Sequence, residues 1–94
     1  MQMRPDQAEI IALQALGWVL ADDELTSVFL GATGADANAL RNAAEDPHVL
    51  GSVLDFVLMQ DQSVLDFAAS IGQPPEAIAM ARHYLNGGEQ VHWT

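Results

Sequence analysis

The sequence predicts an all-α fold: a compact bundle of about six helices, built from two three-helix pseudo-repeats with helix-turn-helix-like turns. Three observations lead to this prediction. Apolar residues recur at helical spacing along most of the chain, and no segment shows the bounded alternation of a strand. Acids precede the apolar stretches and glycines follow them, as is typical of helix starts and ends. The chain also resembles itself.

The internal resemblance appears when residues 16–43 are aligned with residues 54–81, an offset of 38 positions. Eight of the 28 aligned positions are identical, whereas about two would coincide by chance. We therefore expect one domain, residues 1–94, in which residues 9–46 and 47–84 share a core and their long helices pair across a pseudo-two-fold axis. The identical pairs are Leu16/Leu54, Val19/Val57, Leu20/Leu58, Asp23/Asp61, Phe29/Phe67, Gly34/Gly72, Ala39/Ala77 and Ala43/Ala81.

The first helix is expected from Pro5 or Asp6 to Ala21. Asp6 and Glu9 have the spacing of a capping box. Gly17 inside this helix indicates a close helix crossing, because glycine otherwise costs about 1 kcal/mol there. The expected core face consists of Ile10, Leu13, Leu16 and Leu20, widened by Ile11, Ala15 and Val19.

A second, short helix is expected after the Asp22-Asp23 pair, which would cap it. Two glycines in the segment GATGAD, residues 31–36, predict its end. Asp36 then begins a third helix, whose Leu40 and Ala43 would face inward. The apolar residues of the second helix are Leu25, Val28, Phe29 and Leu30.

The second half repeats this order. Asp46 followed by Pro47 is a sharp helix start, and we expect a fifth helix between Asp61 and Gly72. The Pro74-Pro75-Glu76 segment would begin the sixth helix, and the glycines at 87–88 would end it. The fourth helix carries Leu50, Val53, Leu54, Val57 and Leu58, the fifth carries Val64, Leu65, Phe67, Ala68 and Ile71, and the inner face of the sixth is Ile78, Ala81, Tyr84 and Leu85. A flexible tail is predicted over residues 89–94.

The charge is strongly negative: 13 acids stand against three arginines, for a formal net charge of −10. An acidic surface could dock a basic partner, but about half of the acids lie at expected helix starts, where they have a structural reason. There is no cysteine and no apolar run long enough to cross a membrane, and we expect no secretion signal at the N-terminus. We expect a cytoplasmic protein that does not associate with membranes.

One segment has the spacing of a helix-turn-helix. Ala68, Gly72 and Ile78 reproduce its small–glycine–aliphatic pattern, and Leu30, Gly34 and Leu40 repeat it in the first half. The would-be recognition helix carries only Arg82 and His83 as basic residues, and the net charge would repel phosphate. The shape is predicted, but nucleic acid is disfavoured as a partner.

No enzyme, metal or cofactor site is predicted. His48, His83 and His92 do not lie one helical turn apart, and none of the serines stands in a nucleophile motif. Asp55 and Asp66 lie on amphipathic helices and are interpreted as solvent-facing acids. Trp93 is the one aromatic in a polar tail, where it either packs back on the bundle or is an exposed partner anchor.

The segments IALQALGWVLADDE, LGATG, EDP, LDFVL, FAASIG and PPEAI resemble a small alphaproteobacterial family known as domain of unknown function 3572. The resemblance spans roughly Ala8 to Gly88. It implies a compact helical protein of the bacterial cytoplasm. It implies no activity, cofactor or functional residue.

The function is therefore unknown from sequence, and our leading hypothesis is a small non-enzymatic acidic interaction or adaptor protein with an unidentified protein partner. It would be a monomer or a homodimer, and the candidate partner-binding residues are Trp93, Arg82 and His83. One alternative is a helix-turn-helix-shaped nucleic-acid-associated regulator. A second is a small-ligand or enzymatic site between the repeats.

Overall fold

The computed structural model describes residues 3–34, 36, 38, 42 and 46–85, and every regular element in this part of the chain is an α-helix. This confirms the all-α class. The predicted helix after Asp36, the glycines at 87–88 and the tail at 89–94 fall wholly or largely outside the described residues. The helices are α1 (Pro5–Leu20), α2 (Asp23–Thr33), α4 (Pro47–Leu58), α5 (Asp61–Ile71) and α6 (Glu76–Tyr84).

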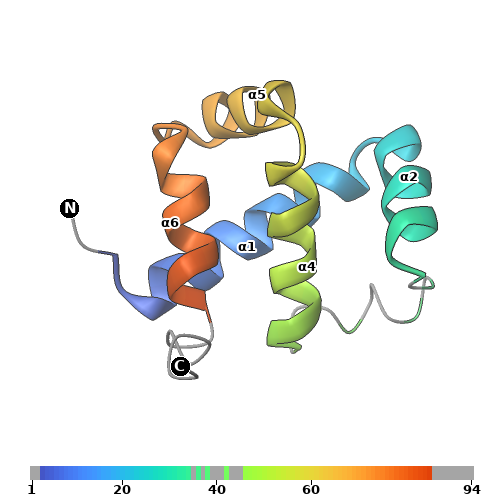
Figure 1. The fold of residues 1–94 in the computed structure, drawn as a ribbon, viewed down its shortest axis with the longest axis horizontal. Coiled ribbons are helices and arrows are strands. Elements are labelled where there is room, and N and C mark those ends of the chain that lie inside the picture. Colours follow the sequence, from blue (N-terminus) through green and yellow to red (C-terminus); the bar gives the residue numbers. More distant parts are fainter. Residues whose placement is uncertain (1–2, 35, 37, 39–41, 43–45, 86–94) are drawn as a thin grey trace.

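Helix α1 is the centre of the bundle. It lies against both α4 and α6, which also contact each other, and it also contacts α2. Figure 1 shows α1 running behind α4 and α6, with α5 bridging the tops of these two helices and α2 standing beside α4. The pairing of the two long helices, α1 and α4, is as predicted. Within the described residues, no helix is long and apolar enough to cross a membrane.

The buried face of α1 differs from the prediction. Leu16 is buried, but Ile10, Leu13 and Leu20 are exposed. Alanines account for the difference. Their small side chains let neighbouring helices approach α1 closely, so the face that carries the alanines is buried. The core consists of Met3, Ala8, Ile11, Ala12, Ala15, Leu16, Val19, Phe29, Leu50, Val53, Leu54, Val57, Phe67, Ala68, Ala77, Ile78, Ala81 and Leu85.

Aspartates cap two helices as predicted. The Asp22 carboxylate accepts hydrogen bonds from the backbone N–H groups of Glu24 and Leu25 at 2.9 and 3.1 Å, and Asp46 accepts one from His48 at 3.0 Å. These bonds satisfy N–H groups that a helix start leaves without an intrahelical partner.

Two further predicted starts, those of α1 and α5, differ in detail. Helix α1 begins with Pro5 at its first position, so Arg4 takes the cap position and its N–H donates to Gln7 Oε1 at 3.2 Å. The predicted Asp6–Glu9 box is therefore wrong. Helix α5 begins at Asp61 as expected, but Gln60 is its cap residue and makes no side-chain cap bond. Asp61 can only act through the helix dipole.

Glycines end α2 and α5 as predicted. Gly34 and Gly72 adopt left-handed φ angles of 74° and 68°, and their N–H groups bond back to the last turns of the helices. Gly17 behaves otherwise: it is exposed, and a Cβ added there would meet nothing within 4 Å. The close crossing predicted at Gly17 is therefore wrong, and the alanine face of α1 takes that role.

The helix boundaries follow the offset found in the sequence. Helices α2 and α5 begin and end 38 positions apart, as do the C-terminal ends of α1 and α4. Two aromatic contacts also join the halves: Trp18 packs on Phe67 with ring centroids 5.6 Å apart, and Phe29 meets Phe56 at 5.3 Å. Because Trp18 aligns with Phe56 and Phe29 with Phe67, each contact corresponds to the other with the halves exchanged. Superposition of residues 9–46 on 47–84 stays a prediction.

Candidate functional site

The structure describes two of the three residues predicted to bind a partner. Arg82 and His83 lie in the last turn of α6, and Trp93 lies outside the described residues. The exposed His83 ring packs edge-on against Tyr84, with centroids 5.0 Å apart. Basic side chains at this position interact favourably with the negative end of the α6 dipole.

The predicted helix-turn-helix positions carry the packing expected of them. Ala68 and Ile78 are buried, and Gly72 makes the left-handed turn between α5 and α6. These three residues determine the shape of the turn and supply no charge. Any affinity of this segment for a nucleic acid would therefore depend on the basic residues of α6, and above all on Arg82.

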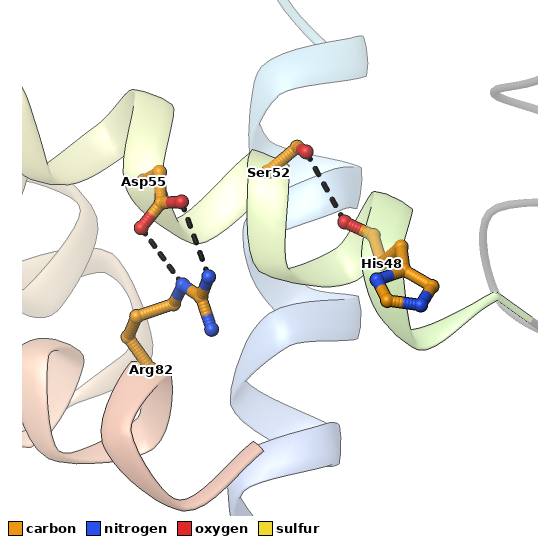
Figure 2. Close-up of polar contacts among 4 residues, drawn as sticks. All are labelled: His48, Ser52, Asp55 and Arg82. Carbon is orange, nitrogen blue, oxygen red and sulfur yellow. Dashed lines mark hydrogen bonds and ion pairs between the residues drawn. The ribbon is translucent and has the colours of Figure 1, made fainter. Parts of the chain in front are cut away.

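Arg82 is committed to another contact. Its Nε donates to Asp55 Oδ1 at 2.7 Å and its Nη2 to Asp55 Oδ2 at 3.3 Å, so the guanidinium holds the carboxylate with two bonds across α4 and α6 (Figure 2). The guanidinium also lies over Gly51, where an added Cβ would be only 3.2 Å from Arg82 Cζ. Arg82 therefore neutralises Asp55 at the surface.

We expect Arg82→Ala and Asp55→Asn each to lower the free energy of unfolding by only about 0.2–1 kcal/mol, because exposed ion pairs contribute little. The two side chains are 34% and 57% exposed. Urea unfolding of both variants and of the double variant measures the coupling between them. A coupling well above 1 kcal/mol would contradict the surface character of the pair.

The other polar residues on the same face of α4 do not form a catalytic relay. The Ser52 hydroxyl donates to the backbone carbonyl of His48 at 3.1 Å, one helical turn back, and not to the imidazole (Figure 2). Asp66, on α5, accepts a hydrogen bond from Gln62 Nε2 at 2.9 Å. Among the described residues, no group of three or more histidines and acids could hold a metal ion.

A groove beside α2 is the strongest candidate site. It has a volume of about 280 Å³ and lies between α2 and the corner where α4 passes into α5. A second hollow of about 220 Å³ extends it along α4 and shares Ala32, Phe56 and Met59. The groove is lined by Asp22, Glu24, Leu25, Val28, Ala32, Phe56, Met59, Gln60 and Ser63. The whole surface is called the α2/α4 groove below.

Two of its large apolar residues are open to solvent. Val28 is 51% and Met59 71% exposed, and both line the α2/α4 groove. Phe56 is half-buried between them and the core, where its ring contacts Phe29. Large apolar side chains that gather in a hollow mark a binding surface more often than single exposed ones do.

Acids stand at one end of the groove. Asp22 is the N-cap residue of α2, and Glu24 lies in the first turn of this helix. Asp55, at the far end, is neutralised by Arg82. The other described arginine is Arg4, whose Nε lies 3.5 Å from Asp6 Oδ1. Within the described part of the chain, no arginine is therefore paired with Asp22 or Glu24.

The groove was not predicted from the sequence, where Val28 counts only as one of the apolar residues of the second helix. A signal was present in the internal resemblance: Val28 aligns with Asp66, and Leu25 with Ser63. A position that is apolar in one half and acidic in the other is expected on the surface. Met59 follows the last residue of α4, outside the helical periodicity from which the core was predicted.

Comparison with known proteins gives a family and no activity. No curated protein and no solved structure matches the chain. One family model does match, over residues 5–88, and its description is "Protein of unknown function (DUF3572)". The match covers most of the chain, in agreement with the resemblance carried by its helix starts and glycine turns. The chain therefore belongs to the DUF3572 family.

Proposed function

We propose that the protein is a small non-enzymatic interaction protein that docks a segment of a basic partner protein in the α2/α4 groove. The observation that carries the proposal is the exposure of Val28 and Met59 in a hollow with acids at one end. Removal of such side chains from water gives the binding free energy, and the acids select the charge of the partner.

A second copy of the chain is a poor occupant. Each copy carries a formal charge of −10, so two copies repel each other, and the acids at the groove would meet further acids. A partner with lysine or arginine beside its apolar side chains gains binding free energy from the same negative charge. A protein of another sequence is therefore the proposed partner. A location in the bacterial cytoplasm and a monomeric or homodimeric free state stay predictions.

The proposed duplication supports a specialised role for this surface. The core positions of the two halves agree, as at Phe29 and Phe67, whereas the groove positions Leu25 and Val28 correspond to Ser63 and Asp66. The two halves thus agree at core positions, which the fold requires, and differ at groove positions, where a partner would bind.

The nucleic-acid alternative has less support, because Arg82 is paired with Asp55. DNA affinity that decreased steeply with salt would favour it. A ligand or enzymatic site between the repeats has less support, because no catalytic group was found there among the described residues. The α2/α4 groove fits a protein segment better.

The test compares capture of partner proteins from a bacterial lysate by the wild type, by a Val28→Ser/Met59→Ser variant and by Leu65→Ser. Leu65 is 50% exposed on α5 and is a matched control, because it is as open as Val28 but does not line the groove. We expect to find a protein that binds the wild type and Leu65→Ser equally well. Its affinity for the Val28→Ser/Met59→Ser variant should be about tenfold or more lower. Burial of one apolar side chain is worth about 1.5–3 kcal/mol, and 1.4 kcal/mol is tenfold.

Calorimetric titration of the purified pair measures this ratio, and circular dichroism checks that each variant is folded. Equal affinity of the wild type and the groove variant would overturn the proposal. A loss confined to Leu65→Ser would move the docking surface to α5.

A further inference from the structure

We infer that the occupant of the α2/α4 groove is an amphipathic α-helix of about three turns, with lysine or arginine at the end that lies over Asp22 and Glu24. This inference rests on the proposed function and adds the conformation and the polarity of the partner segment to it.

The length follows from α2. Leu25, Val28 and Ala32 are spaced by three and four residues, so they lie on one face of the helix and line one wall of the groove. From Asp22 to Ala32 the wall extends about 15 Å, or about three turns, at roughly 1.5 Å per residue. A ligand that covers this wall needs apolar side chains at a matching spacing, which a helix of similar length provides.

The conformation follows from the backbone of the walls. Both walls are helices, whose N–H and C=O groups are bonded within the helix except at the ends. An extended segment would find few backbone partners along the groove and would leave its own donors and acceptors unpaired. A helix bonds its backbone internally and needs only to offer an apolar stripe.

The polarity follows from the distribution of charge. At one end, Asp22 and Glu24 have no arginine beside them among the described residues. At the other end, Asp55 is bonded to Arg82 and Ser52 to the carbonyl of His48, so little free charge or hydrogen-bonding capacity is offered there. Cationic residues of the partner helix thus gain most at the Asp22 end.

The test titrates the full-length, ¹⁵N-labelled protein with a designed peptide of about four turns, made of leucine, alanine and lysine. Leucines form one stripe at helical spacing, and the lysines flank one end of it. One matched peptide has glutamate for lysine. Another has the same composition with the leucine spacing scrambled. We expect the lysine peptide to shift amide signals of α2 and of the α4–α5 corner, and the two matched peptides to bind at least about tenfold more weakly.

Charge-removal variants supply the second arm. Asp22→Asn with Glu24→Gln keeps the cap and the shape, since asparagine caps helices as well as aspartate. We expect it to weaken the lysine peptide about threefold or more. The control is Asp61→Asn with Glu76→Gln, which removes two charges beside a different hollow, between α5 and α6. It should change the affinity much less.

The outcomes separate this inference from the proposed function. Equal binding of the lysine and glutamate peptides in the groove would overturn the cationic end, and equal binding of the scrambled peptide would overturn the helix. Loss of the captured partner in Val28→Ser/Met59→Ser, without any peptide binding in the groove, would overturn only this inference. Insensitivity of both partner and peptide to that variant would overturn both.

Discussion

Replacement of Phe67 by alanine is expected to lower the free energy of unfolding by about 3–5 kcal/mol. The ring is completely buried and packs on Trp18 from α1, so its loss removes buried apolar surface and leaves a cavity beneath the indole. Since a small domain is stable by only about 5–15 kcal/mol, the variant should be close to unfolding. Urea unfolding followed by circular dichroism measures the change.

Phe29→Ala should cost a similar amount, because Phe29 is 1% exposed and has the corresponding ring partner, Phe56. Leu65→Ala, on the exposed face of α5, is the control and should change stability by less than about 0.5 kcal/mol. A mild effect at either phenylalanine would place that ring outside the core.

Ala12→Leu is expected to cost about 1–3 kcal/mol or more by overpacking. Ala12 is completely buried in the middle of α1, on the face that also holds Ala8 and Ala15, and α1 lies against both α4 and α6. Three added carbon atoms can be accommodated only if one of these helices moves or the new side chain takes a strained rotamer. The melting temperature and the urea midpoint should both decrease.

Gln14→Leu is the matched control, because it introduces the same side chain two positions further along α1, at an exposed site. Its effect should be within about 0.5 kcal/mol. Equal stabilities of the two leucine variants would show that the alanine face of α1 is not closely packed.

Helix starts and ends could be predicted from the sequence wherever neighbouring residues alone determine them. The cap at Asp22, the Asp46-Pro47 start and the left-handed turns at Gly34 and Gly72 depend on a few neighbouring residues, and all were predicted correctly. Helix α4 was also predicted well, because Leu50, Val53, Leu54 and Val57 leave only one apolar face to bury.

The prediction failed where two faces of a helix competed. Helix α1 has large apolar residues at Ile10 and Leu13 and alanines at Ala12 and Ala15, and hydrophobicity alone favours the larger side chains. The alanine face of α1 is nevertheless the buried one, because α4 and α6 pack against it, and this is a tertiary effect. The groove was missed for the same reason: it lies between helices, and no single helix pattern contains it.

The exchange of aromatic partners between the halves has a consequence for folding. Trp18 and Phe29 are synthesised first, but Phe67 and Phe56, on which they pack, come much later in the chain. Each ring has its partner in the other half, so the Phe29 ring stays without its partner until α4 has been made, and the Trp18 ring until α5 has been made. Such non-local contacts slow folding relative to a bundle of helical hairpins, because loop closure must precede the gain from packing. The protein should therefore fold in one cooperative step that waits for most of the chain, and not half by half.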